Sequence, residues 1–251
     1  CLSRKQTEDV SEFLNKKNYR AIPYHAGQES NIRKNNQEIF INENGIIMVA
    51  TIAFGMGIDK SNIRFVAHLS LPSSIESYYQ EIGRAGRDGL PAESLLLYNL
   101  DDIRLRRMQI DESVGKLEKK IADHGRLNAL LGFVGAQKCR RSKILEYFEG
   151  KAYTSCQNCD LCAKVPKLFD ATESVRKVLS VIYRTKENFG ANYLIDILRG
   201  KASDKARKLS HSQLPTFGSG SDLNKKQWEA VFLQIMGLDL IRPSSERRGA
   251  F

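Results

Sequence analysis

Apolar positions in the first hundred residues alternate between two spacings. Residues 46–50 and 65–71 are dominated by apolar side chains over the length of a buried parallel strand. Between such runs the apolar residues recur at helical spacing, as Val10, Phe13 and Leu14 do. Strands that alternate with amphipathic helices are typical of an open α/β sheet. Residues 1–100 are therefore predicted to form an α/β lobe with a parallel sheet.

Helical spacing replaces the strand pattern after residue 100. Leu117, Ile121 and Leu127 share a helical register among lysines and glutamates. This register predicts a helical hairpin that leads into a group of cysteines. We expect residues 101–166 to form this second domain.

A third pattern begins at Thr172. Three apolar helical stripes follow, with a polar stretch at 201–222 between the second and the third. Leu240 and Ile241 open a predicted terminal strand. Three short helices, a loop and a terminal strand are typical of a winged helix, a relative of the helix-turn-helix. Residues 167–251 are expected to form this domain.

The charge is unevenly distributed along the chain. The formal net charge is +10, with 15 basic and 9 acidic side chains in residues 166–251 against 14 and 13 in residues 1–110. A local basic excess favours a polyanionic partner such as nucleic acid, although charge that serves solubility fits equally well. No apolar run reaches the roughly 18 residues of a transmembrane helix, so no membrane association is expected.

Four of the five cysteines fall within 24 residues. Two residues separate Cys156 from Cys159 and Cys159 from Cys162, and Cys139 precedes this triplet by seventeen positions. Thiolates at this spacing can bind one metal ion from a tight turn. The thiolate of Cys139 can complete a tetrahedral shell that leaves no coordination position open. The spacing predicts a structural zinc ion in a reducing compartment, and thiols at chance spacing are the alternative. Cys1 lies outside the set.

The segment YQEIGRAGRDG at 79–89 carries two arginines three positions apart, Arg84 and Arg87. Arginine stabilises charge that develops on a transferring phosphoryl group, because it is always cationic and can donate two parallel hydrogen bonds. The glycines of the segment let another surface approach closely. Gln80 can position a phosphate oxygen or a water molecule. The alternative is a basic helix end that interacts with its own dipole.

A second motif, VATIAFGMGID at 49–59, runs from an apolar strand into a turn. Its glycines, Gly57 among them, let backbone N–H groups meet phosphates. Thr51 can donate a hydroxyl hydrogen, and Asp59 can orient a cation or an arginine. The alternative is a tight strand-to-helix turn in which Asp59 caps a helix.

Together with CLSRK at 1–5 and YHAG at 24–27, these two motifs resemble the second motor lobe of RecQ-type DNA helicases of superfamily 2. The resemblance implies a RecA-like lobe in which Arg87, with Arg84, faces ATP held by another lobe, and Arg87 is the arginine finger. It implies that three residues couple the nucleotide state to the cleft, namely Gln80, Asp59 and Gly57. It implies that four residues lie near the DNA strand, namely Arg4, His25, Thr51 and Phe54. Without the resemblance, His25 is better interpreted as a packed turn residue.

The later domains carry matching signals. Cys-Arg-Arg at 139–141 and the cysteine spacing resemble the zinc-binding subdomain of the same family, and both arginines can face either DNA or solvent. SHSQLPTFG at 210–218 resembles a loop of RecQ-family winged-helix domains, which grip duplex DNA through its phosphates. The candidate DNA contacts in this domain are Lys205, Arg207 and His211. Solvated surface charge is the alternative for each. Trp228 is predicted to lie in the core.

The motifs that bind ATP in this superfamily do not occur in the chain. They are a GxxxxGK[ST] phosphate loop and a DExH-type carboxylate set for Mg²⁺. The Gly-Lys pairs lack both the preceding glycine and the following Ser or Thr, at 115–116, 150–151 and 200–201. The resemblance therefore implies that a first RecA-like lobe lies outside this chain, that the chain alone is inactive, and that ATP and Mg²⁺ are cofactors of the intact enzyme.

The resemblance implies that the chain is part of an ATP-dependent helicase that moves 3′ to 5′ on DNA in repair and recombination. Its expected location is the bacterial cytoplasm, at the nucleoid, or a eukaryotic nucleus. Two alternatives stay open. The chain can be a complete, non-enzymatic DNA-binding or adaptor protein built from helicase parts. It can also be a zinc-dependent transcription regulator that uses the winged helix alone, which leaves Arg84 and Arg87 without a purpose.

Overall fold

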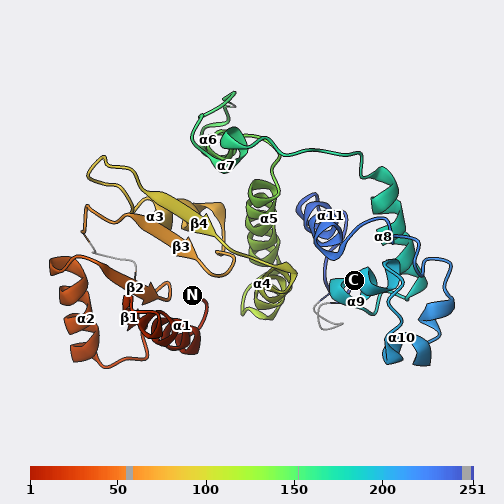
Figure 1. Ribbon diagram of the computed structural model, residues 1–251, viewed down its shortest axis with the longest axis horizontal. Coiled ribbons are helices and arrows are strands. Elements are labelled where there is room, and N and C mark those ends of the chain that lie inside the picture. The colour runs from red at the N-terminus through yellow and green to blue at the C-terminus, as the bar shows by residue number, and fades with distance from the viewer. Residues whose placement is uncertain (55–58, 152, 245–249) are drawn as a thin grey trace. The chain divides into compact units, whose positions relative to one another are not determined.

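A computed structural model describes residues 1–54, 59–151, 153–244 and 250–251 (Figure 1). The chain divides into two compact units, the first made of residues 1–72 and 76–99 and the second of residues 73–75 and 100–251. Gly57, predicted at the nucleotide-coupling turn, lies outside the described residues. Among the helices that are described, none combines the length and the apolar character needed to cross a bilayer.

The first unit alternates helices and strands, as the apolar pattern predicted. In chain order its elements are α1 (Arg4–Lys16), β1 (Arg20–Tyr24), α2 (Ser30–Asn42), β2 (Ile46–Ala50), β3 (Phe65–His68), α3 (Ile75–Ile82) and β4 (Glu93–Leu96). β1 pairs in parallel with β2, so that Tyr24 lies opposite Ala50. β3 pairs in parallel with β4, so that His68 lies opposite Leu96. The predicted parallel pairing is confirmed, and in the part of the lobe that the structure describes it occurs in two separate two-stranded sheets.

The carboxyl ends of β1 and β2 meet at one edge of their sheet. His25 follows the last residue of β1, and Thr51 follows the last residue of β2. The Thr51 N–H donates to the Tyr24 carbonyl over 3.2 Å, which continues the ladder past the last strand pair. The buried apolar residues of this part of the lobe include Ala21, Phe40 and Val49. The pairing therefore places two predicted site residues side by side.

α1 does not bury the apolar face that its sequence predicted. Phe13 is 59% exposed, and the buried residues of the helix are Thr7 and Ser11. The Ser11 hydroxyl and the Asn15 amide both donate to the Ala21 carbonyl, and the Asn15 side chain also accepts from the Ala21 N–H. Polar side chains thus hold this helix to the backbone of β1, a role that apolar periodicity does not reveal.

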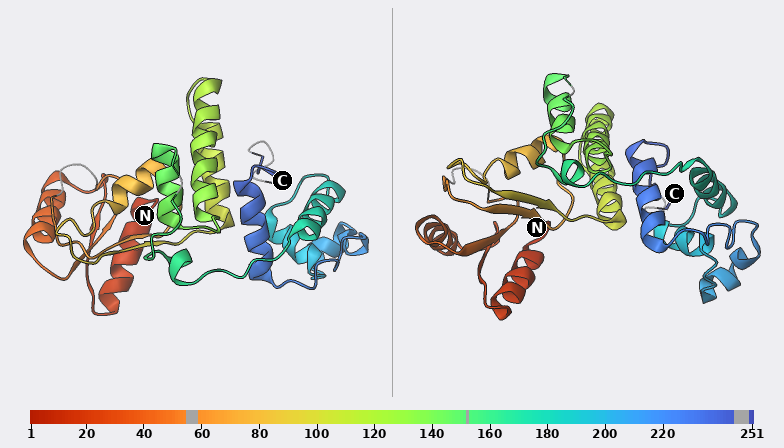
Figure 2. Two further views of the ribbon diagram at one scale, coloured as in Figure 1. Left: turned by 90° about the horizontal axis from the view of Figure 1, so that it is seen from above. Right: turned by 45° about the horizontal axis from the view of Figure 1, so that its top comes forward.

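The second unit is helical. Its elements are α4 (Leu100–Glu112), α5 (Leu117–Val134), α6 (Arg140–Glu149), α7 (Asp160–Ala163), α8 (Thr172–Arg184), α9 (Ala191–Leu198), α10 (Asp204–Lys208), the 3₁₀ turn η1 (His211–Gln213) and α11 (Lys225–Gly237). α4 and α5 form the predicted hairpin, and α11 packs against α5 (Figure 2). Leu130, Leu131, Trp228 and Phe232 are each at most 1% exposed and form the centre of its core. The predicted core position of Trp228 is confirmed.

The predicted terminal strand at Leu240 and Ile241 is wrong. In the described part of this region, β pairing is limited to an isolated antiparallel bridge between Ser244 and Ala250. Asp239 has a φ of +58°, and Pro243 has no backbone N–H to donate to a ladder. The apolar run between these two residues is therefore too short to form a regular strand.

Candidate zinc and nucleotide-coupling sites

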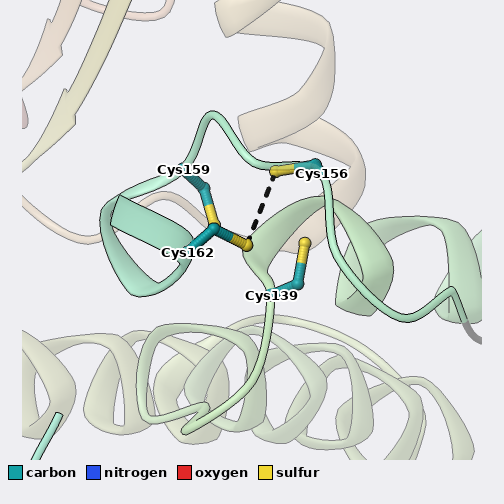
Figure 3. A group of neighbouring side chains, drawn as sticks. All are labelled: Cys139, Cys156, Cys159 and Cys162. Carbon is teal, nitrogen blue, oxygen red and sulfur yellow. Dashed lines mark hydrogen bonds between the residues drawn. The ribbon is translucent and has the colours of Figure 1, made fainter. Parts of the chain in front are cut away.

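The four clustered cysteines converge on one point (Figure 3). Cys139 precedes the first turn of α6 and Cys159 precedes the first turn of α7, so two helix starts present their thiols to the same space. All four Sγ atoms lie within 4.8 Å of one another, and those of Cys156 and Cys162 are 3.9 Å apart. Zn–S bonds of about 2.3 Å in a tetrahedron require sulfurs about 3.8 Å apart. The donor set and its spacing therefore fit zinc.

Hydrogen-bond donors surround these sulfurs. The Ser142 N–H points at Cys139 Sγ over 3.5 Å, and the Ser155 hydroxyl donates to Cys162 Sγ over 3.3 Å. The Ser155 hydroxyl is the main reason that the pKa of Cys162 falls to about 6, whereas burial raises the pKa of the Cys139 thiol. Donors of this kind stabilise thiolates, which are the form that binds a metal.

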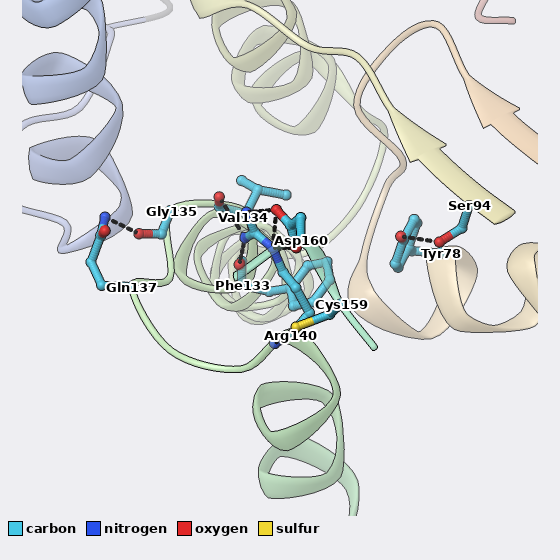
Figure 4. A network of polar contacts seen from close by, with 9 residues as sticks. All are labelled: Tyr78, Ser94, Phe133, Val134, Gly135, Gln137, Arg140, Cys159 and Asp160. Atoms are coloured by element: carbon cyan, nitrogen blue, oxygen red, sulfur yellow. Dashed lines mark hydrogen bonds and ion pairs between the residues drawn. The ribbon is translucent and has the colours of Figure 1, made fainter. Parts of the chain in front are cut away.

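Arg140 ties the cysteine cluster to the helical hairpin (Figure 4). Its guanidinium donates to the carbonyls of Phe133 and Val134, at the end of α5, over 2.8 and 2.9 Å. It also pairs with the Asp160 carboxylate at 3.0 Å and thereby lowers the pKa of that group. The backbone N–H of Arg140, in contrast, points at Cys159 Sγ over 3.4 Å. The sequence left two interpretations of Arg140, a DNA contact or a solvated charge. Its contacts instead give it a structural role between α5 and α7.

Arg87 and Asp59 lie together at the surface of the first unit. Arg87 Nε donates to the Gly83 carbonyl over 3.2 Å, and its Nη1 is 3.7 Å from Asp59 Oδ1. The two side chains are 43% and 94% exposed, so neither is enclosed in the lobe. Arg84 is half-buried just beyond α3, and Gln80 is exposed on that helix. An anion brought by another surface can thus reach Arg87.

The four residues expected near the DNA strand lie at the carboxyl edge of β1 and β2. Their side chains differ in how far they are exposed to solvent. His25 is 4% exposed and its Nε2 lies 3.1 Å from Glu8 Oε1. The Arg4 side chain lies over Gly27, where an added Cβ would be 2.8 Å from Arg4 Cδ. Arg4 is exposed and Thr51 half-buried, so both can meet a ligand.

The fourth of these residues, Phe54, is half-buried against aromatic neighbours. Its ring centroid is 4.8 Å from that of Tyr24 and 5.4 Å from that of Phe40, both in edge-on geometry. Aromatic pairs at such distances stabilise a fold in addition to their burial. Phe54 therefore anchors the turn after β2.

An aromatic and basic group marks the winged-helix region. The rings of Phe189 and Tyr193 stack with centroids 4.5 Å apart, and Lys205 Nζ lies 5.0 and 5.2 Å from those centroids. The Tyr193 hydroxyl meets His211 Nδ1 at 2.8 Å. Burial, with the Lys205 charge, lowers the pKa of His211, so this ring favours its neutral form. Arg207 is paired with Asp204 at 3.3 Å on an exposed surface.

Family models match three consecutive parts of the chain. A helicase conserved C-terminal domain matches residues 1–89, a RecQ zinc-binding domain matches residues 100–163, and an RQC domain matches residues 165–251. The chain is homologous to the C-terminal region of RecQ helicases. The resemblance stated from the motifs is confirmed, as is the order of RecA-like lobe, zinc-binding part and winged helix. A structural zinc ion fits both the RecQ zinc-binding domain and the geometry of the cysteines.

Curated relatives support the same assignment. The ATP-dependent DNA helicase RecQ of Haemophilus influenzae is 44% identical over 96% of this chain and 39% of its own length. RecQ of Bacillus subtilis is 41% identical over 86% of this chain and 36% of its length. The RecQ-like DNA helicase blm-1 of Caenorhabditis elegans is 37% identical over 90% of this chain and 24% of its length. The chain thus spans about two fifths, or less, of these RecQ relatives.

Proposed function

We propose that this chain supplies the second motor lobe, the zinc module and the winged helix of an ATP-dependent DNA helicase that moves 3′ to 5′ in repair and recombination. The observation that carries the proposal is the surface position of Arg87 beside Asp59, 3.7 Å away, in a lobe that itself has no phosphate-binding loop. An exposed arginine beside a carboxylate, on a turn rich in glycine, suits a pocket completed by a second lobe. Homology to RecQ helicases supports the same assignment.

In this proposal the first RecA-like lobe binds ATP and Mg²⁺, and this chain completes the site when the lobes close. Arg87 donates to the γ-phosphoryl oxygens as their charge develops, with Arg84 beside it, and Asp59 releases Arg87 as the nucleotide arrives. Gln80 and Gly57, with Asp59, pass the nucleotide state to the cleft. Without a bound γ-phosphate the arginines have nothing to stabilise, so the chain alone does not hydrolyse ATP.

DNA binds to two surfaces in this proposal. One strand follows the carboxyl edge of β1 and β2, where Arg4 and Thr51 are accessible and His25 and Phe54 support the edge from within. Duplex DNA lies on the winged helix, which contributes Lys205, Arg207 and His211. The three functional parts are then residues 1–100, 101–166 and 167–251, and the protein acts at the nucleoid or in a nucleus.

The zinc module has a structural role in this proposal. Its ligands are Cys139, Cys156, Cys159 and Cys162, which leave no coordination position open for catalysis. A bound ion would join the starts of α6 and α7 through Cys139 and Cys159, and Arg140 connects both helices to the end of α5. The module thus connects the hairpin to the segment that leads into the winged helix.

Substitution of Arg87 in the full-length protein tests the proposed function. We expect Arg87→Ala to lower DNA-stimulated ATP hydrolysis by about 10³-fold or more, the usual contribution of an arginine finger, while DNA affinity stays unchanged. Arg20→Ala is the matched control, because Arg20 forms an exposed pair with Glu43 elsewhere on the same lobe. Wild-type turnover in Arg87→Ala would contradict the proposal. DNA binding by a wild-type full-length protein that hydrolyses no ATP would instead favour the adaptor alternative.

A further inference from the structure

The turn that carries Arg84 and Arg87 has little regular structure of its own. α3 ends at Ile82, and β4 begins only at Glu93. Gly86 has a φ of +67°, and an added Cβ there would lie 3.0 Å from the Leu90 carbonyl oxygen. Short-range bonds within the turn, such as that from the Ala85 N–H to the Ile82 carbonyl over 3.1 Å, do not attach it to the rest of the lobe. A catalytic arginine must nevertheless be held in place before the nucleotide arrives. Some part of the lobe must therefore fix this turn.

The segment just before β3 provides backbone anchors for the turn. The Gly86 N–H donates to the Ile63 carbonyl over 2.9 Å, and the Asp88 N–H donates to the Ser61 carbonyl over 3.3 Å. These two bonds lie on either side of Arg87 in the sequence. They hold the turn against residues 61–63. Both are backbone bonds, so no side chain takes part in orienting the turn through them.

Arg64 adds side-chain contacts beyond these anchors. Its Nη2 lies 2.6 Å from each carboxylate oxygen of Asp88, and its Nη1 donates to the Pro91 carbonyl over 3.1 Å. Its Nε donates to the Asn62 carbonyl over 3.1 Å. Asp88 Oδ1 in turn accepts the Leu90 N–H over 3.1 Å. One guanidinium thus joins the segment before β3 to two points of the turn, and each of its nitrogens has a partner within the lobe.

We propose that Arg64 is a positioning residue that braces the turn through Asp88 and thereby orients the neighbouring Arg87 toward the nucleotide. The inference rests on the proposed function of Arg87. Arg64 itself does not contact phosphate, because its nitrogens are engaged by Asp88, Asn62 and Pro91. A planar fork is suited to this brace, since it can meet a carboxylate and a carbonyl at fixed angles, which a lysine ammonium cannot do.

The proposal is tested in the full-length protein with Arg64→Ala, Asp88→Ala and the double variant. We expect each single variant to lower kcat for DNA-stimulated ATP hydrolysis by about 10- to 100-fold, with little change in KM for ATP or in DNA affinity. The double variant should be no slower than the slower single variant, because both remove the same brace. Arg20→Ala, which removes an equally short pair with Glu43, should leave kcat unchanged.

Three outcomes would overturn the brace. They are wild-type kcat in Arg64→Ala, an equal fall in kcat in Arg20→Ala, and additive losses in the double variant. Where Arg64→Ala does not yield folded protein, Arg64→Lys retains the charge without the fork and should have an intermediate kcat, and wild-type kcat there would also refute the proposal. If Arg87→Ala loses activity and Arg64→Ala keeps wild-type activity, the brace is refuted and the proposed function of Arg87 is not. Retention of activity in Arg87→Ala refutes the proposed function itself.

Discussion

Trp228 shows how one close contact fixes the winged-helix core. It is the single tryptophan of the chain, it is 0% exposed, and its indole N–H donates to the Gly220 carbonyl over 2.8 Å. A Cβ at Gly220 would lie 2.4 Å from the indole Cζ2, well inside van der Waals contact. The loop before α11 therefore needs a residue without a side chain at this position, because its backbone lies directly on the ring.

Gly220→Ala should consequently destabilise the second unit. The added methyl must displace the indole or the loop, and overpacking of this kind costs about 1 to 3 kcal/mol of unfolding free energy. Urea unfolding of the chain, followed by Trp228 fluorescence, measures the change directly. Gly125→Ala in α5 is the control, since a Cβ there meets nothing within 4 Å and should leave stability unchanged or slightly raised. Equal midpoints for Gly220→Ala and the wild type would show that the loop yields without cost.

Single residues also mark the limit of what the sequence predicts. The four cysteines could be predicted to lie together because they are closely spaced in the sequence. Arg84 and Arg87 could be identified as candidates because their motif is contiguous, and their role stays a prediction. Arg64 and Arg140 could not, since their carboxylate partners lie 24 and 20 positions away and are brought near by the fold. In the sequence alone, an arginine that braces a turn cannot be distinguished from one that is solvated.

At the scale of elements, the zinc module depends on more than helix formation. α7 has four residues, and a helix this short does not form without outside support. That support is expected from the metal, which would hold the N-terminal ends of α6 and α7 together through Cys139 and Cys159. Loss of one ligand should therefore release both the ion and the short helix.

Cys139→Ser tests this dependence on zinc. We expect the purified chain to carry one zinc ion and the variant to retain much less, with a metal affinity at least about 10-fold lower, because a hydroxyl does not replace a thiolate ligand. Metal analysis after dialysis against a weak chelator measures the difference. Cys1→Ser is the control, since Cys1 lies outside the cluster and should leave the zinc content at one. Full zinc retention in Cys139→Ser would remove Cys139 from the ligand set.

The helical hairpin shows why helices could be predicted from the sequence while the polar contacts between them could not. The apolar spacing of residues 117–131 predicted a helical hairpin, but Arg107 on α4, at 1% exposure, is among the most buried side chains of the unit. Its guanidinium donates to His124 Nδ1 and Asn128 Oδ1 over 3.2 and 2.5 Å and lies 3.9 Å from Asp239. Because arginine can only donate, His124 Nδ1 accepts and its Nε2 donates to Asp111. A buried polar junction of this kind resembles surface charge in the sequence.

At the scale of the whole molecule, the order of domains could be predicted and the details of the sheet could not. Alternating apolar patterns predicted a parallel lobe followed by two helical parts, and the family models match three parts in that order. The sequence did not indicate that the strands of the described residues pair as two separate two-stranded sheets, since pairing depends on contacts between distant segments. The net charge of residues 166–251 could be obtained from the sequence, because it depends only on their 15 basic and 9 acidic groups and not on how the chain folds.

This charge leads to a prediction about DNA affinity. Binding of duplex DNA by the chain should weaken steeply as salt rises, because each phosphate contact releases condensed counterions. Arg207→Ala should weaken binding across DNA sequences and reduce the slope of log Kd against log salt by about 1. Fluorescence anisotropy at several salt concentrations measures both effects.

The matched control for Arg207 is Arg176→Ala. Arg176 is also an exposed arginine of the second unit, and it is paired with an acidic residue three positions away, as Arg207 is. If phosphate contact depends on position and not on total charge, Arg176→Ala should leave the slope unchanged. Equal reductions in the two variants would mean that the basic excess acts as a diffuse field, and a flat salt dependence in the wild type would exclude phosphate contacts by this domain altogether.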